Sequence, residues 1–225
     1  MNLSIKRLTI SVSFLALQIF SVNAQQYLNP EYIKVTNERA AKIVETLELS
    51  NPEKEKIVTD IIAQQYRDLS RIQDERDAEI DEVKKSDLSK EVQGSKIDEI
   101  KTEADKSVSE LHKSYLNKLS EQLSEDKIDA VKDGMTYGVF PKTYASYLEM
   151  IPSLTEEEKE YIYNNLKEAR EYAMDGGSSD EKHKWFGKYK GRINNYLSAR
   201  GYDLEKEREG WYKRIEEREK NKSKQ

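Results

Sequence analysis

The 225-residue sequence contains no cysteine and only two histidines. Without cysteine there is no disulfide framework, so the fold must be held together by a hydrophobic core. A zinc site in a protein takes about four ligands, drawn mostly from cysteine and histidine. Such a site is therefore not predicted, and no motif typical of a phosphate or dinucleotide site is visible. We expect neither a bound metal nor a cofactor.

Proline and glycine are scarce, at four and nine residues, and no alternating run of apolar and polar residues has the length of a β-strand. Because proline and glycine disfavour helix interiors, their scarcity favours long helices. Charged and hydrophobic residues each make up 36% of the chain, a balance that suits slender, exposed helices. The sequence therefore predicts an all-α, multi-helix fold.

Long apolar runs are absent except near the N-terminus. There Lys6 and Arg7 precede an apolar run at residues 8–20, and a short cleavage-like segment follows at residues 22–24. This order is typical of a secretory signal peptide, whereas a transmembrane anchor needs about 20 apolar residues. We predict a cleaved signal peptide at residues 1–24, a periplasmic or secreted product, and no transmembrane segment after cleavage.

Apolar residues recur every three or four positions through most of the remaining chain. The longest such stretch, residues 52–122, is interrupted by a turn signal at Ser86 and Asp87, so it predicts a long antiparallel helical hairpin. Its heptads are too few to predict a dimeric coiled coil, which leaves the oligomeric state open. We expect a single helical domain at residues 25–204 and a charged C-terminal helix or tail at residues 205–225.

Two sequence patterns mark helix starts. Ser50 with Glu53, and Thr155 with Glu158, each match the capping box, in which a hydroxyl and a carboxylate bond to each other's backbone amides. Ser179 is the expected cap of a later helix, because it follows the glycine pair at residues 176–177.

A basic and aromatic segment, residues 182–202, departs from the rest of the composition. It carries six Lys or Arg, one histidine and no acid, although the whole chain has a formal net charge of -5. The overall acidity argues against a nucleic-acid partner, while the local reversal of sign indicates a binding surface. Aromatic faces stack on sugar rings, and Lys or Arg pair with carboxylates. The candidate ligand-binding residues are Trp185, Lys188, Arg192 and Tyr144.

The tyrosines have a second interpretation. Tyrosine at helical spacing is common in protein cores, where its hydroxyl finds a hydrogen-bond partner. The sequence leaves both interpretations open.

His183 and Tyr137 are the candidates for acid–base catalysis. His183 would need a carboxylate partner such as Asp175 close in space; otherwise a single histidine near a helix start is structural. His112 lies on the predicted hairpin among charged residues, and we expect it to be a solvated surface residue.

Gly187 and Gly191 share one helical stripe with His183. Glycine inside a helix costs about 1 kcal/mol relative to alanine, so the missing side chains should serve a purpose. Either a neighbouring helix packs closely against these glycines, or a ligand approaches the backbone there.

Four segments, residues 37–44, 65–69, 132–138 and 184–197, resemble a domain-of-unknown-function family of secreted Bacteroidetes proteins. The last of them, KWFGKYKGRINNYL, is the most specific. The resemblance covers nearly the whole chain after the signal peptide. It implies an exported helical domain, sometimes associated with polysaccharide-utilisation gene sets, and it brings neither an activity nor catalytic residues.

Three functions remain as alternatives, so whether the chain is an enzyme stays open. The first is a secreted or periplasmic binding or accessory protein, linked to polysaccharide utilisation, whose partner is an acidic glycan. The second is an enzyme, a lyase or hydrolase of an acidic polysaccharide, in which His183 or Tyr137 transfers protons. The third is a periplasmic helical chaperone of protein clients, because the helix starts at residues 49–54 and 154–159 resemble those of small periplasmic stress chaperones.

Overall fold

The computed structural model describes residues 29–222, which fold into helices and contain no β-strand. The predicted all-α fold is confirmed. The predicted signal peptide and residues 223–225 lie outside the described residues. Within the described part, no helix is both long and apolar enough to cross a bilayer.

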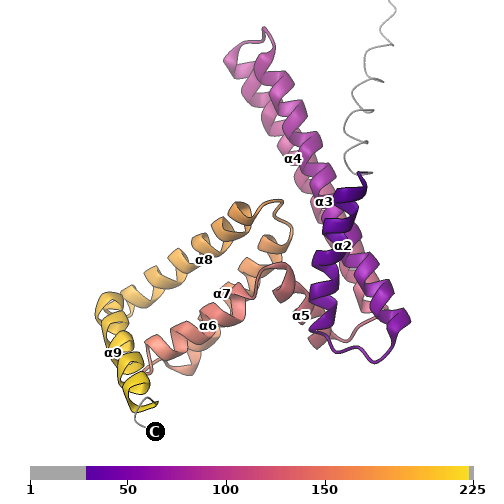
Figure 1. The fold of residues 1–225 in the computed structure, drawn as a ribbon. Coiled ribbons are helices and arrows are strands. Elements are labelled where there is room, and N and C mark those ends of the chain that lie inside the picture. Colours follow the sequence, from indigo (N-terminus) through magenta and orange to yellow (C-terminus); the bar gives the residue numbers. More distant parts are fainter. Residues whose placement is uncertain (1–28, 223–225) are drawn as a thin grey trace, which may run out of the picture.

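The helices are α2 (Pro30–Glu45), α3 (Pro52–Lys85), α4 (Lys90–Ser120), α5 (Glu125–Met135), α6 (Val139–Met150), α7 (Glu156–Met174), α8 (Ser179–Ala199) and α9 (Leu204–Lys222). Helices α3 and α4 form the long antiparallel hairpin, whose turn lies at residues 86–89. Figure 1 shows this hairpin projecting beyond the other helices, with α9 at the far side of the molecule.

The helix starts agree with the sequence patterns in part. The Thr155–Glu158 capping box is confirmed, because the backbone amide of each residue donates to the side chain of the other, at 2.9 and 3.3 Å. The cap of α3 is Asn51 rather than Ser50, and its side chain accepts from the amides of Glu53 and Lys54. Proline suits the first helical position, which Pro52 occupies, so the residue before it becomes the cap.

Helix α8 departs from the prediction in the same way. Its cap is Ser178 rather than Ser179, and the Ser178 hydroxyl accepts from the amide of Glu181 at 3.1 Å. The predicted caps of α3 and α8 are therefore each wrong by one residue.

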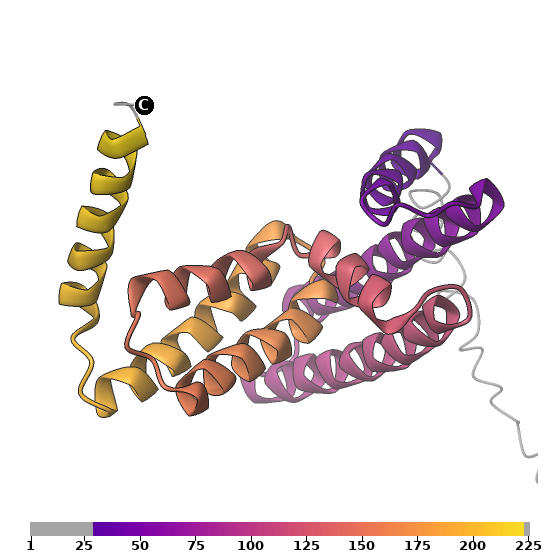
Figure 2. The same cartoon turned by 90° about the horizontal axis from the view of Figure 1, so that it is seen from below.

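Two hydrophobic cores hold the helices. The first lies among α2, α3, α4 and α5, and includes Ile62, Leu119 and Val131. The second lies among α6, α7 and α8, which run side by side in Figure 2, and includes Ile162, Phe186 and Ile193. Met174, the last residue of α7, belongs to the first core. The C-terminal end of α7 is therefore where the two cores meet.

Gly187 and Gly191 lie on the exposed surface of α8. A Cβ atom added to either glycine would meet nothing within 4 Å beyond its own helix backbone. The expectation that a neighbouring helix packs closely against them is therefore wrong for the part of the chain that the structure describes.

This open placement predicts that Gly187→Ala and Gly191→Ala each raise the free energy of unfolding by about 0.5–1 kcal/mol, because alanine loses less backbone entropy in a helix. Urea unfolding followed by circular dichroism measures the change. Gly134→Ala in α5 is the control, since its Cβ would lie 2.9 Å from Cγ2 of the buried Ile43, and it should lower the free energy of unfolding. Destabilisation by all three substitutions would contradict the open placement.

Candidate functional site

A cleft of about 850 Å³ separates the hairpin from the α7–α8 pair. One wall comes from the middle of α3 and α4, where Gln73, Arg76 and His112 face the cleft. The other wall comes from the end of α7 and the first half of α8, where Asp175 and Trp185 face it. Side chains from helices of both cores therefore line a common space.

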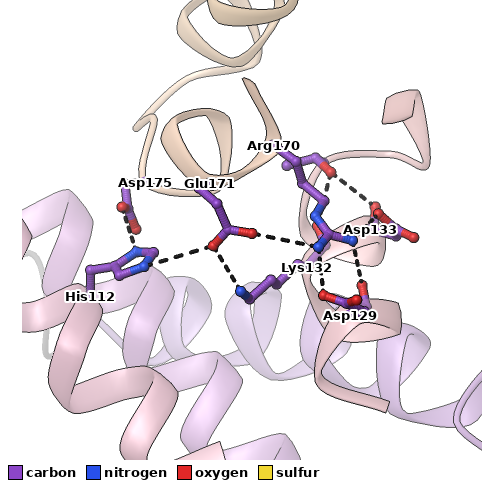
Figure 3. A network of polar contacts seen from close by, with 8 residues as sticks. His112, Asp129, Lys132, Asp133, Arg170, Glu171 and Asp175 are labelled. Carbon is purple, nitrogen blue, oxygen red and sulfur yellow. Dashed lines mark hydrogen bonds and ion pairs between the residues drawn. The ribbon is translucent and has the colours of Figure 1, made fainter. Parts of the chain in front are cut away.

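His112 and Asp175 form a hydrogen-bonded pair across this cleft (Figure 3), with Nδ1 of His112 2.8 Å from Oδ2 of Asp175. A carboxylate oxygen only accepts, so Nδ1 carries the hydrogen and Nε2 is left for other contacts. The side chains of His112 and Asp175 are 21% and 15% exposed. His112 is thus a partly buried, oriented imidazole, and the expectation of a solvated surface residue is wrong.

The electrostatic surroundings of His112 favour its charged form. The hydrogen bond to the Asp175 carboxylate is the largest effect, and it raises the pKa of His112 above its ordinary 6.5 against the opposing effect of burial. Glu171 adds to the rise, with Oε2 3.9 Å from Nε2 of His112. The ammonium of Lys132 opposes it.

Glu171 has ionic partners of its own. Lys132 donates to Oε2 of Glu171 at 2.7 Å, and the Arg170 guanidinium lies 3.5 Å from Oε1. Arg170 is only 1% exposed and also pairs with Asp129 and Asp133 of α5, as Figure 3 shows. This cluster fixes the Glu171 carboxylate beside the imidazole.

The end of α7 places Asp175 opposite His112. Asp175 is the C-cap of the helix, and its backbone carbonyl accepts a hydrogen bond of 3.1 Å from the amide group of Gln73 in α3. Two residues later, Gly177 occupies a position where a side chain is sterically excluded, because a Cβ atom would lie 1.5 Å from Oε1 of Gln73. Glycine at position 177 therefore allows the α7–α8 loop to reach the hairpin.

A buried lysine closes the same helix end. Lys182 in α8 donates to the carbonyls of Ala173 and Met174, both at 3.1 Å. These carbonyls lie in the last turn of α7, where the helix has no further backbone amides to donate hydrogen bonds to them. Burial lowers the pKa of Lys182 to about 8.

The α7–α8 wall carries an aromatic pair. The rings of Tyr172 and Trp185 stack with centroids 4.6 Å apart and an interplanar angle of 17°. The Lys188 ammonium lies 4.8 Å from the centroid of the Trp185 ring. Tyr172 is 46% exposed, so the pair leaves aromatic surface open to a ligand.

Three lysines of the cleft have no acidic partner. Lys113, Lys184 and Lys188 line it, and among residues 29–222 none of them forms an ion pair with a carboxylate. By contrast, Asp175 and Glu171 are already paired with His112 and Lys132. The ammonium groups of these three lysines are therefore available to pair with an acidic ligand.

Trp185 and Lys188, two of the predicted ligand-binding residues, lie in this cleft. The other two do not line it. The Arg192 guanidinium lies 4.5 Å from the Tyr189 centroid and 3.6 Å from the carboxylate of Glu168. Tyr144 packs edge-on against Tyr163 with centroids 5.4 Å apart.

The predicted catalytic candidates lie together, but outside the cleft lining. The rings of Tyr137 and His183 stack with centroids 6.2 Å apart. Nδ1 of His183 is 2.7 Å from the backbone carbonyl of Ser179, one turn earlier in α8. No ion pair joins His183 to a carboxylate in the described part of the chain.

His112 was missed because its partner lies 63 residues away in the sequence. A signal was nevertheless present. His112 lies four residues after Val108 and three before the buried Tyr115, which is the spacing of an inward-facing stripe on α4. As for metals, residues 29–222 contain no group of three or more His, Cys, Asp or Glu side chains that could hold an ion.

The chain matches a known family model. A family model described as "Protein of unknown function (DUF3826)" matches residues 33–217, a span that contains both walls of the cleft. No curated protein matches the chain.

The His112–Asp175 hydrogen bond predicts that His112 titrates above 6.5 in the folded protein and that Asp175→Asn lowers its pKa. Because the folded pKa exceeds the unfolded one, the stabilising contribution is full below about pH 6.5 and is lost as pH rises through the folded pKa. NMR titration of the His112 ring protons in the unchanged protein and in Asp175→Asn measures both pKa values. A pKa of His112 that Asp175→Asn leaves unchanged would contradict the pairing.

Proposed function

Since the chain belongs to the DUF3826 family of proteins of unknown function, we propose its function from the cleft. The protein is an exported helical binding protein, and the cleft holds an acidic carbohydrate. The observation that carries this proposal is the stacked Tyr172–Trp185 pair on a cleft wall with unpaired lysines.

The aromatic pair supports a ring-shaped ligand. A pyranose ring presents C–H groups on its faces, and these pack against the negative face of an aromatic π-system. Trp185 is held in place by Tyr172 and by the Lys188 ammonium, so little side-chain entropy is lost on binding. A cleft of about 850 Å³ lies within the range of ligand pockets.

The charges support an acidic ligand. The whole chain is acidic, at a formal net charge of -5, so lysines without carboxylate partners are not explained by the general composition. Lys184 and Lys188 lie on α8 one turn apart, on either side of Trp185 along the helix. A carboxylate on a stacked sugar ring would gain charge-assisted hydrogen bonds from them.

Export is supported by the N-terminal pattern of Lys6, Arg7 and the apolar run at residues 8–20. The four segments that resemble secreted Bacteroidetes proteins support a setting in polysaccharide utilisation. An exported binding protein in that setting would meet acidic polysaccharides or their fragments outside the cytoplasm.

Expression of the full chain in a Gram-negative host should yield a periplasmic or secreted product whose N-terminus is Gln25, because signal peptidase cleaves after small residues such as Ala24. Intact-mass spectrometry and N-terminal sequencing of the fractionated protein check this. Replacement of residues 8–20 by a polar sequence is the control and should leave the protein in the cytoplasm. An uncleaved, membrane-bound product would contradict the proposal.

The binding proposal predicts that a galacturonic acid trimer binds the protein, and that its carboxyl-reduced, neutral counterpart binds more weakly. Trp185→Ala should weaken the affinity by about tenfold, because the exposed Tyr172 ring loses the partner that holds it in place. The paired change Lys184→Gln with Lys188→Gln should weaken it further and reduce its dependence on salt. Isothermal titration calorimetry measures these affinities.

The chain supplies matched controls for both changes. Trp211→Ala removes the other of the two tryptophans, which lies on α9 and donates to Glu149. Lys190→Gln removes a charge from α8 outside the cleft lining. Equal losses in the cleft variants and in these controls would count against the cleft, and no binding of either trimer would count against the function.

A further inference from the structure

The floor of the cleft brings two hydrogen-bond acceptors to one place. When His112 is neutral, its Nδ1–H donates to Asp175, so the Nε2 lone pair is free to accept. Oε2 of Glu171 is 3.9 Å from this nitrogen. Two acceptors that each lie about 2.8 Å from one water oxygen are about 4.4 Å apart at the ordinary angle of a water molecule, and the observed 3.9 Å corresponds to an angle of about 90°. The geometry therefore fits a water molecule that donates one hydrogen to His112 and the other to Glu171.

A water molecule held in this way is positioned as a nucleophile. Both of its hydrogens point to the cleft floor, so a lone pair points into the space between the walls. Asp175 fixes the ring orientation and the tautomer of His112, as the carboxylate does in other histidine–carboxylate pairs. Glu171 is fixed in turn by Lys132 and Arg170.

We propose that the cleft hydrolyses an ester, with His112 as the catalytic general base, Glu171 holding the water, and Asp175 as the positioning residue. The water oxygen bonds to the ester carbonyl carbon while its proton passes to Nε2 of His112. The carbon–alkoxy bond of the tetrahedral intermediate then breaks, and the alkoxide takes the proton from Nε2. The products are a carboxylic acid and an alcohol, and water is the only co-reactant.

Ester hydrolysis fits this site better than cleavage of a glycosidic bond. Cleavage of a glycosidic bond generally uses two carboxyl groups, one on each side of the bond. Of the four carboxylates that line the cleft, Asp175 and Glu171 lie on the same wall and are paired with His112 and Lys132. Glu181 accepts from the amide of Gly177, so among residues 29–222 Asp105 on the hairpin wall has no unpartnered carboxylate opposite it. Ester hydrolysis needs one group that accepts a proton and then returns it, and His112 is such a group.

The remaining lining defines the substrate class. The unpaired ammonium groups of Lys113, Lys184 and Lys188 provide positive charge for the oxyanion of the tetrahedral intermediate. If the ring that stacks on the Tyr172–Trp185 pair is a sugar, the substrate is an acylated or esterified sugar; this part rests on the proposed function. The proton transfer at His112 does not depend on it.

Base catalysis by His112 gives the reaction a defined pH dependence. The charged groups that act on the imidazole are Asp175 and Glu171 at the end of α7 and Lys132 from α5. The other charged groups of the cleft lining are Arg76 from α3, Asp105 and Lys113 from α4, and Glu181, Lys184 and Lys188 from α8. Only neutral His112 accepts a proton, so the rate should rise with pH and reach a plateau above the pKa of His112. The midpoint should equal the pKa measured by NMR for the same residue.

The test uses p-nitrophenyl acetate and the chain without its signal peptide. His112→Gln should lower the multiple-turnover rate by about a hundredfold, because glutamine still donates to Asp175 but cannot take up a proton. His183→Gln, at the only other histidine of the chain, should leave the rate unchanged. Asp175→Asn should lower the rate and shift the midpoint of the pH profile down, which a purely structural role would not do.

Circular dichroism and thermal unfolding confirm that each variant is folded. If His112→Gln does not fold, Asp175→Asn and the pH profile of the unchanged protein decide the question. Equal rates in the unchanged protein and His112→Gln, or a rate that is independent of pH across the pKa of His112, would overturn the proposal. Because p-nitrophenyl acetate carries no sugar, loss of turnover with galacturonate binding intact defeats only this inference, and turnover without galacturonate binding defeats only the proposed function.

Discussion

The buried guanidinium of Arg170 is the interaction on which the two-core architecture depends. It lies on α7 and binds Asp129 and Asp133 of α5, and its charge lies over the Phe140 ring at 5.1 Å. The guanidinium is 1% exposed, whereas the side chains of Asp129 and Asp133 are 43% and 27% exposed. Loss of the carboxylates would therefore leave a buried charge without compensation, which is strongly destabilising. Arg170 therefore positions the C-terminal end of α7 against the first core. Asp175 is the C-cap of α7, so its position follows from that of this helix end.

Between α7–α8 and the hairpin, polar contacts prevail over close packing. The two sides are joined by the His112–Asp175 pair and by the hydrogen bond from Gln73 to the carbonyl of Asp175. If apolar side chains interdigitated here, they would fill the space between the walls, as they do inside each core. Met174 packs into the first core at the end of α7, and beside it the walls are joined by hydrogen bonds and charges.

Sequence reasoning found the features that local chemistry decides. Apolar spacing predicted the hairpin, and the Thr155–Glu158 box predicted the start of α7. The ligand-binding role of Trp185 and Lys188 stays a prediction. Sequence reasoning missed the features that tertiary contacts decide. In the sequence, Asp175 belongs to a segment that ends a helix. No residue near it indicates that it contacts a histidine on another helix. His183 attracted attention because of its neighbours in the sequence, whereas the histidine with a carboxylate partner is His112.

The same geometry links the site to the docking of the two cores. His112 comes from the helices of the first core, whereas Tyr172 and Trp185 come from α7 and α8 of the second core. No wall of the cleft contains both the imidazole and the aromatic pair. A ligand that contacts both walls therefore interacts fully only with the docked arrangement, and by linkage its binding must stabilise that arrangement. A protonated His112 favours docking as well, because its charge strengthens the contact with Asp175. Protonation therefore strengthens the contact between the walls while removing the base that the proposed ester hydrolysis needs, so the two requirements on His112 oppose each other near its pKa.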